Sequence, residues 1–429
     1  MKIAFLTLGC KVNKYETDLL KERFEKAGHI VVDFDNKADM YVINSCSVTN
    51  MSDRKTRQMI SKARAKNPEG IIAVIGCSVQ SNKERLENFN DVDIILGNDS
   101  KMDLYDVYLK YSKSLEKQVC IEDIGSVKEY KDVGTRNKGY EIREAIKIED
   151  GCNNFCSYCV IPYTRGRVRS RELDSIYNEA ISLVKSGVKE LILVGIEVAS
   201  YGLDKENISL FNILDKLDKI EGLQRIRLSS MEPRFLTEEN LKKLATYTKL
   251  CPHFHISMQS GNTEVLKRMN RKYTKETLIE VALNIKKYFK DAYLASDIIV
   301  GFPGETDEEF MDTKDTVEKM DLTEIHVFKY SKRQYTRAAK MDGQVDGNVK
   351  KQRSEELLNI SKYKNKVYLS KYVGEKVEVL FENYTNGVLT GYTPNYIKVK
   401  VEGEEKLCGT IQGVVVTSLD KDILLGKLD

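Results

Sequence analysis

The sequence contains no tryptophan, only six prolines and no hydrophobic run long enough to cross a membrane. A membrane-spanning helix needs about 20 consecutive apolar residues. The first apolar run, at 3–6, is also too short for the core of a secretion signal. We therefore expect a cytoplasmic protein without membrane partners. No low-complexity tract that would indicate disorder interrupts the 429 residues.

A strong excess of charge of one sign is also missing. The 68 Lys and Arg residues are balanced by 65 Asp and Glu residues, which gives a net charge of +3. This balance excludes a protein that binds polyanions over its whole surface, as histones do, but it leaves room for a local basic patch. The length predicts about three domains.

Short apolar runs alternate with amphipathic helical segments, which is typical of parallel βαβ units. Residues 1–120 predict an open parallel α/β domain, followed by a polar linker at 121–143. A second series at 144–335 contains six strand–helix units and favours a partial (β/α)6 barrel. After a basic bridge at 336–371, the short strands within 372–429 predict a small antiparallel β-barrel. The expected strands of the two series are 2–8, 40–43 and 71–75, and then 145–148, 191–194, 225–228, 254–257, 294–300 and 324–328.

Nine cysteines in a chain without a secretion signal argue against a disulfide framework and for reduced thiols that bind metal or perform chemistry. Cys10, Cys46 and Cys77 each follow the end of a predicted strand. Because the carboxyl ends of parallel strands share one edge of a sheet, we expect these thiols to converge. A shared metal or cluster site is favoured. The alternative is three buried cysteines that act as small hydrophobic residues.

Cys152, Cys156 and Cys159 form a C-x3-C-x2-C motif directly after the first strand of the second series. Three thiolates at this spacing can hold three irons of a [4Fe–4S] cluster and leave the fourth iron open for a small molecule with an amine and a carboxylate. The alternative is a zinc site, which needs a fourth ligand. His253 and His255 are the candidates for that ligand, although both are expected within a strand.

The motif, with an aromatic residue before its last cysteine, resembles the signature of radical S-adenosylmethionine enzymes. Together with the first three cysteines and a C-terminal barrel similar to the TRAM module, it makes essentially the whole chain similar to the methylthiotransferases among them. Within that family, the segment 9–13 (GCKVN) is similar to the branch that acts on threonylcarbamoyladenosine at position 37 of tRNA. Isopentenyladenosine of tRNA and a ribosomal protein are the alternative substrates. Further matching segments are 161–167, 255–261, 266–271 and 296–306.

This resemblance implies that the C2–H of an adenine is replaced by C2–SCH3, which requires radical chemistry because that hydrogen is not acidic. The 152–159 motif would hold a [4Fe–4S] cluster that binds S-adenosylmethionine, and one-electron reduction would yield a 5′-deoxyadenosyl radical. A second [4Fe–4S] cluster on the first three cysteines would carry the sulfur, and a second S-adenosylmethionine would supply the methyl group. The implied partners are tRNAs that decode ANN codons and an electron donor such as flavodoxin or ferredoxin.

Contacts to S-adenosylmethionine are expected from the motif and from the ends of the barrel strands, where parallel barrels build their active sites. Gly195 and Glu197 follow the second strand, and a polar loop without a ligand is the alternative for them. The full set of expected contacts is Tyr158, Gly195, Glu197, Gln259, Asp297 and Val327.

Arg165, Arg167, Arg169 and Arg171 alternate after the motif and would share one face of an extended segment, where they suit RNA phosphates. Structural ion pairs are the alternative. The basic bridge is a second candidate for RNA contacts. The C-terminal barrel carries more acidic than basic residues, so we expect it to orient tRNA rather than to supply affinity. A non-catalytic iron–sulfur protein that binds RNA is the alternative from a different class, but simple binding needs no open iron site.

Overall fold

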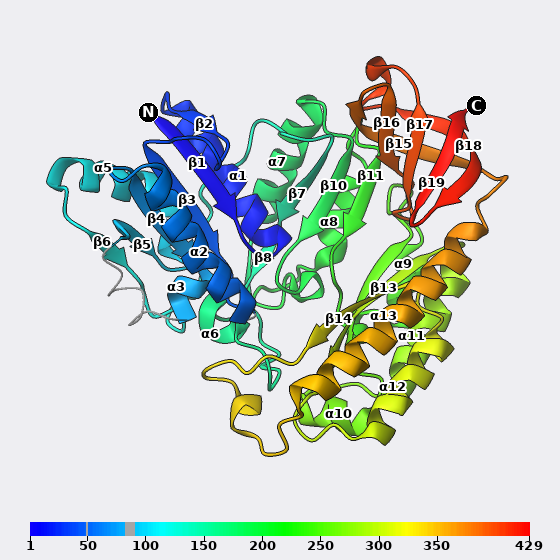
Figure 1. The fold of residues 1–429 in the computed structure, drawn as a ribbon. Coiled ribbons are helices and arrows are strands. Elements are labelled where there is room, and N and C mark those ends of the chain that lie inside the picture. The colour runs from blue at the N-terminus through cyan, green and yellow to red at the C-terminus, as the bar shows by residue number, and fades with distance from the viewer. Residues whose placement is uncertain (49, 82–90) are drawn as a thin grey trace.

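The computed structural model describes residues 1–48, 50–81 and 91–429 (Figure 1). The N-terminal part is a parallel sheet of six strands in the order β2-β1-β3-β4-β5-β6. Helix α2 covers one face of the sheet, and α1 and α5 cover the other. The strands are β1 (Lys2–Thr7), β2 (Ile30–Val32), β3 (Met40–Ser45), β4 (Ile71–Gly76), β5 (Ile94–Leu96) and β6 (Gln118–Cys120), and the helices are α1 (Lys11–Lys26), α2 (Asn50–Lys66), α3 (Cys77–Ser81), η1 (Ser100–Asp103) and α5 (Leu104–Ser114).

The central part is the predicted partial barrel of six parallel strands. It is built from two three-stranded sheets, β11-β10-β7 and β12-β13-β14, which isolated bridges join at Ile226–Leu250 and Met231–Ile256. The strands are β7 (Arg143–Lys147), β10 (Glu190–Val194), β11 (Arg225–Leu228), β12 (His253–Gln259), β13 (Tyr293–Val300) and β14 (Glu324–Lys329). The helices and short turns around them are α6 (Ile161–Arg165), α7 (Leu173–Lys185), η2 (Val198–Ser200), α8 (Leu210–Leu217), η3 (Pro233–Phe235), α9 (Glu238–Leu244), α10 (Thr263–Arg268), α11 (Lys275–Tyr288) and α12 (Asp307–Met320), and β8 (Glu149–Asp150) pairs with β9 (Arg169–Ser170).

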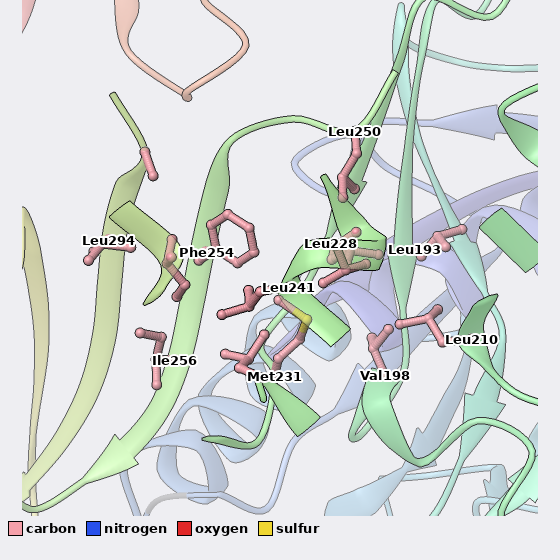
Figure 2. Packing of buried hydrophobic residues seen from close by; sticks show 14 of the residues in the cluster. Leu193, Val198, Leu210, Leu228, Met231, Leu241, Leu250, Phe254, Ile256 and Leu294 are labelled. Atoms are coloured by element: carbon pink, nitrogen blue, oxygen red, sulfur yellow. The ribbon is translucent and has the colours of Figure 1, made fainter. Parts of the chain in front are cut away.

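The barrel strands alternate in character because successive side chains point to opposite faces. One set, which includes Leu193, Leu228 and Phe254, packs against the surrounding helices in the largest core of the molecule (Figure 2). The other set faces the inside of the barrel, here called the lumen. Its members near the start of the strands are charged or polar, such as Arg143 and Glu190. The barrel therefore has an apolar outer core and a polar interior.

The C-terminal part is a closed barrel in the order β15-β16-β17-β19-β18. The structure differs from the prediction in that β17 and β19 run parallel, and β19 was not expected. Residues of the basic bridge form the long helix α13 beside β14 (Figure 1). The elements are η4 (Arg337–Lys340), α13 (Gly347–Ser370), β15 (Lys376–Thr385), β16 (Val388–Tyr392), β17 (Lys398–Glu402), η5 (Glu405–Leu407), β18 (Ile411–Asp420) and β19 (Ile423–Leu428).

Two tyrosines of this C-terminal barrel reach the start of the central barrel. The ring of Tyr396 lies 4.7 Å from the Arg227 guanidinium and 4.9 Å from the ring of His253. The ring of Tyr392 lies 4.6 Å from the guanidinium of Arg143. These partners come from three different strands, β7, β11 and β12. The two tyrosines therefore cover the end of the lumen at which the barrel strands begin.

The polar segment 121–142 contains no helix or strand, but it is firmly attached. Arg136 within it is fully buried and donates to Glu179 on α7 (3.0 Å) and to Glu144 on β7 (2.9 Å). Helix α1 packs on the lumen side of β10 through Val12. Helix α1 also contacts β7, so the N-terminal sheet domain lies against the side of the central barrel that is formed by β7 and β10. Within the described residues, no helix combines the length and apolarity required for a membrane span.

We expect Phe254→Ala to lower the free energy of unfolding by about 3–5 kcal/mol, because the ring is 1% exposed and packs edge-on against Phe289 at 4.7 Å. Denaturant unfolding followed by circular dichroism measures the change. Leu203→Ala is the control, since that side chain is 70% exposed. Equal unfolding midpoints for the two variants would contradict the packing described.

Candidate functional site

The first three cysteines lie together at the carboxyl edge of the N-terminal sheet. Cys10 precedes α1, Cys46 follows β3, and Cys77 begins α3 directly after β4. Burial raises the pKa of the Cys46 thiol to about 11, and the nearby thiols of Cys77 and Cys10 contribute to that shift. Gly9 has φ +102°, and a Cβ at this position would lie 2.8 Å from the Cys46 sulfur. The sequence-based prediction that these thiols converge agrees with this geometry.

The second set of cysteines lies on the loop between β8 and α6. The loop folds back on itself where the Cys159 N–H donates to the Cys156 carbonyl (3.0 Å). Asn270 anchors it by donating to the Phe155 carbonyl (3.0 Å). Burial and the neighbouring Cys156 raise the pKa of the Cys159 thiol to about 12. A positive metal centre would offset this cost, since thiols bind metals as thiolates.

Each set offers three sulfur donors, which suits an iron–sulfur cluster with one iron left open. The two histidines considered as a fourth zinc ligand lie in β12, and each has a ring nitrogen without a hydrogen bond in the part of the chain that the structure describes. His253 packs on Tyr396, and His255 Nε2 lies 3.0 Å from Asp297 Oδ1. Among the residues that the structure describes, no three His, Cys, Asp or Glu side chains are grouped closely enough to hold a single metal ion. The all-sulfur donor set of each group of three cysteines suits a cluster better than zinc, which needs a fourth ligand.

A pocket of about 180 Å³ opens beside the second cysteine set. Tyr158, Cys159, Gln259 and Asp297 line it, so the structure brings together three of the expected cofactor contacts. Val327 does not line this pocket. Its side chain packs with the outer core, and the next residue, Phe328, forms the wall instead.

Gly195 and Glu197 lie around a buried carboxylate that the sequence analysis did not single out. Glu149 Oε1 accepts a hydrogen bond from the Glu197 N–H (2.7 Å), and a Cβ on Gly195 would lie 2.1 Å from the same oxygen. Burial, with a smaller effect of Glu232, raises the pKa of Glu197 to about 7. These contacts explain locally why residue 195 has no side chain.

Two buried polar atoms near this loop have no hydrogen-bond partner among the described residues, namely Glu149 Oε2 and Arg271 Nε. A carboxylate and a guanidinium with unused hydrogen-bonding capacity suit a ligand that carries an ammonium and a carboxylate group, as S-adenosylmethionine does. Both residues were missed from the sequence. Glu149 lies three residues before Cys152, and Arg271 ends one of the matching segments, so sequence position was the available signal.

The four alternating arginines do not share an exposed face, which corrects the sequence-based expectation. Arg165 ends helix α6 and is fully buried, and Arg169 is buried in β9, where it donates to the Arg165 carbonyl (2.8 Å). Arg171 is buried and donates to the Tyr15 hydroxyl (2.9 Å). Arg167 alone of the four is exposed. Structural ion pairs, the alternative reading, account for the buried members.

Arg165 is the centre of a buried set of charges between the sheet domain and the barrel, here called the interdomain ion network. It donates to Asp150 Oδ1 (2.9 Å) and to Glu16 Oε1 (3.1 Å). Lys147 bridges the same two carboxylates at 2.6 and 2.7 Å. Lys101 also pairs with Glu16. The network therefore consists of Glu16, Lys101, Lys147, Asp150 and Arg165.

The network extends to the first cysteine set. Asn98 Oδ1 accepts from Lys101 (2.8 Å), while its amide nitrogen lies 3.4 Å from the Cys77 sulfur and donates to the Thr164 carbonyl on α6 (2.6 Å). Cys10 is exposed as a residue, but the protein around its thiol removes part of the hydration and raises its pKa, and the positive charge of Arg165 partly opposes that shift. The charges that join the domains thus also surround the thiols.

Comparison with known proteins matches residues 146–317 to the family described as the Radical SAM superfamily and residues 2–97 to the Uncharacterized protein family UPF0004. The threonylcarbamoyladenosine tRNA methylthiotransferase MtaB of Bacillus subtilis is 39% identical over 420 residues, which are 96% of this chain and 93% of that protein. The tRNA-2-methylthio-N(6)-dimethylallyladenosine synthase of Alkaliphilus oremlandii is 37% identical over 443 residues, which are 100% and 92% of the two chains. The radical S-adenosylmethionine methyltransferase TsrM of Kitasatospora setae has a similar fold, with a TM-score of 0.59, 16% identity and coverage of 79% of this chain and 77% of that one.

We expect Arg165→Met to lower the free energy of unfolding by about 3–5 kcal/mol, because it leaves Asp150 and Glu16 buried with too few partners. Denaturant unfolding, together with the rate of proteolysis in the 121–142 segment, measures the effect. Arg167→Met is the matched control, because that side chain is exposed and lies over the Phe155 ring at 4.4 Å, a contact worth about 0.5–1 kcal/mol. If both variants unfold alike, the network does not hold the domains together.

Proposed function

Because the chain belongs to the methylthiotransferase family of radical S-adenosylmethionine enzymes, we propose that it converts N6-threonylcarbamoyladenosine at position 37 of tRNA into its 2-methylthio derivative. The observation that carries the proposal is the full-length similarity to relatives with that name. The two converging cysteine sets support it independently, because the reaction needs a radical and an inserted sulfur.

We assign one [4Fe–4S] cluster to Cys152, Cys156 and Cys159 and a second to Cys10, Cys46 and Cys77. When bound, these clusters would supply reductive cleavage of S-adenosylmethionine and the sulfur for insertion. The protein binds and orients the cofactor between Tyr158, Gln259 and Asp297. Glu149 and Arg271, with their unpartnered buried atoms, are suited to its ammonium and carboxylate.

For RNA binding, the exposed Arg167 remains a candidate beside the cysteine loop, and the Lys-rich helix α13 is a second one. The C-terminal barrel would orient the tRNA. We further propose that the substrates are tRNAs that decode ANN codons, that flavodoxin or ferredoxin donates the electron, and that the reaction takes place in the cytoplasm, where tRNA is modified.

The second candidate function is the same chemistry on isopentenyladenosine of tRNA. Similarity to dimethylallyladenosine synthases favours it, although at slightly lower identity. A ribosomal protein as substrate and a non-catalytic RNA-binding role have no comparable support.

We expect total tRNA from a strain without this gene to lack the methylthio form of threonylcarbamoyladenosine and to accumulate its unthiolated precursor. Nucleoside mass spectrometry measures both, and a plasmid copy of the gene restores the product. Loss of the isopentenyladenosine form instead would move the substrate to the second candidate. Unchanged levels of both nucleosides would argue against tRNA as the substrate.

We expect Cys156→Ala to abolish 5′-deoxyadenosine formation, because it removes a ligand of the cluster that binds S-adenosylmethionine. Cys46→Ala should retain much of that product but form no methylthiolated nucleoside. Chromatography of reduced, cluster-loaded enzyme measures both products, and the iron content and circular dichroism of each variant control for folding. Equal loss of both products in a folded Cys46→Ala variant would contradict separate roles for the two sets.

A further inference from the structure

The buried side chain of Asn98 contacts a member of the first cysteine set. It lies on the loop between β5 and η1. Its Nδ2 atom lies 3.4 Å from the sulfur of Cys77 and 2.6 Å from the carbonyl oxygen of Thr164 on α6. One amide group therefore contacts both a proposed cluster ligand and the helix that follows the second cysteine set.

Two contacts determine which end of this amide faces the sulfur. The ammonium group of Lys101, which can only donate, binds Asn98 Oδ1 at 2.8 Å. The Thr164 carbonyl oxygen, which can only accept, lies against Nδ2. If the two amide atoms changed places, donor would meet donor and acceptor would meet acceptor. The N–H group of Asn98 is therefore the end that points towards Cys77.

The loop that carries Asn98 is also held in place by its backbone. The N–H of Asn98 donates to the side chain of Gln80 (3.2 Å), which lies on α3, the helix that begins at Cys77. The carbonyl of Gly97 accepts from the backbone N–H of Lys101 (3.0 Å). The position of the amide relative to the sulfur is thus determined by several independent hydrogen bonds.

An N–H donor in this position suits a sulfur that binds metal. A Cys77 thiol could donate to Asn98 Oδ1 (3.7 Å), but a metal-bound thiolate can only accept a hydrogen bond. A hydrogen bond to a cluster ligand stabilises the negative charge that reduction adds, so it makes the cluster easier to reduce. The positive charge of Lys101 at the far end of the amide polarises the N–H bond and strengthens this effect.

We propose that Asn98 is a positioning residue, which holds the Cys77 thiolate through its side-chain N–H and raises the reduction potential of the cluster on the first cysteine set. This inference rests on the proposed function, because it requires the cluster assigned there to Cys10, Cys46 and Cys77. Loss of one hydrogen bond to a charged group corresponds to about a tenfold change in the equilibrium constant of reduction, or about 59 mV for one electron.

The test is a redox titration of the cluster-loaded holoenzyme followed by electron paramagnetic resonance. S-adenosylmethionine alters the signal of the cluster that binds it and so distinguishes the two clusters. Asn98→Leu keeps the branched shape but removes the donor, so we expect the potential of the first-set cluster to fall by about 59 mV. Asn98→Asp should lower it further, because a carboxylate adds negative charge while it still accepts from Lys101. The other cluster should keep its potential in both variants.

Ser100→Ala is the matched control, and we expect it to leave both potentials unchanged. Ser100 is buried two residues further along the chain, and its hydroxyl donates to the Cys120 carbonyl instead (2.7 Å). Iron content and circular dichroism show whether each variant is folded and carries both clusters.

An unchanged potential of the first-set cluster in a loaded Asn98→Leu variant would overturn the role of Asn98 and leave the proposed function intact. An equal fall in Ser100→Ala would do the same, because the effect would then not depend on the sulfur contact. If replacing Cys10, Cys46 and Cys77 together by Ala leaves the iron content unchanged, no cluster is bound there. That result would contradict both this inference and the two-cluster assignment of the proposed function.

If neither Asn98 variant retains the first-set cluster, the wild-type holoenzyme decides. Pulsed electron paramagnetic resonance of protein that contains nitrogen-15 in its asparagine side chains should show weak hyperfine coupling between the reduced first-set cluster and an amide nitrogen. Such coupling supports the hydrogen bond from Asn98 to Cys77, and its absence overturns the inference.

Discussion

The arrangement of this molecule depends on the interdomain ion network around Arg165. Buried charges are unfavourable unless every member is paired, so the network is satisfied in one relative orientation of the sheet domain and the barrel. Glu16 and Lys101 come from the sheet domain, and Lys147, Asp150 and Arg165 come from the barrel. Because Arg165 ends the short helix that follows the 152–159 loop, and Asn98 links the network to Cys77, the docking also fixes the two cysteine sets relative to each other.

Much of the fold could be predicted from the sequence because its strands are buried and its helices are amphipathic. The strand at 225–228 has the predicted limits, and those of the other barrel strands differ by at most two residues. The failures have physical reasons. The strands β2, β5 and β6 are three residues long, too short for a periodic pattern. The parallel pairing of β17 with β19 depends on barrel closure, which no local pattern contains.

The site was predictable where residue type and topology together determine position. Cysteines at the ends of parallel strands converge because those ends share an edge. The alternating arginines misled because spacing shows which residues are charged but not where their partners lie. One carboxylate that pairs with Arg165 is that of Glu16, which lies on α1 and is far away in sequence. Glu149 and Arg271 were missed for the same reason, since an unsatisfied buried atom is recognised only once its surroundings are known.

Tyr392 and Tyr396, which cover the end of the lumen at which the barrel strands begin, give the C-terminal barrel a second structural role. Tyr396 contacts lumen residues of β11 and β12, and Tyr392 covers Arg143 on β7. The module that resembles an RNA-binding fold therefore also forms part of the wall around the interior of the central barrel. Because the C-terminal barrel forms part of the wall of the central barrel, the access of water to the lumen depends on the relative position of the two domains. The position of this module is thus coupled to the central barrel through two aromatic rings rather than through a flexible tether.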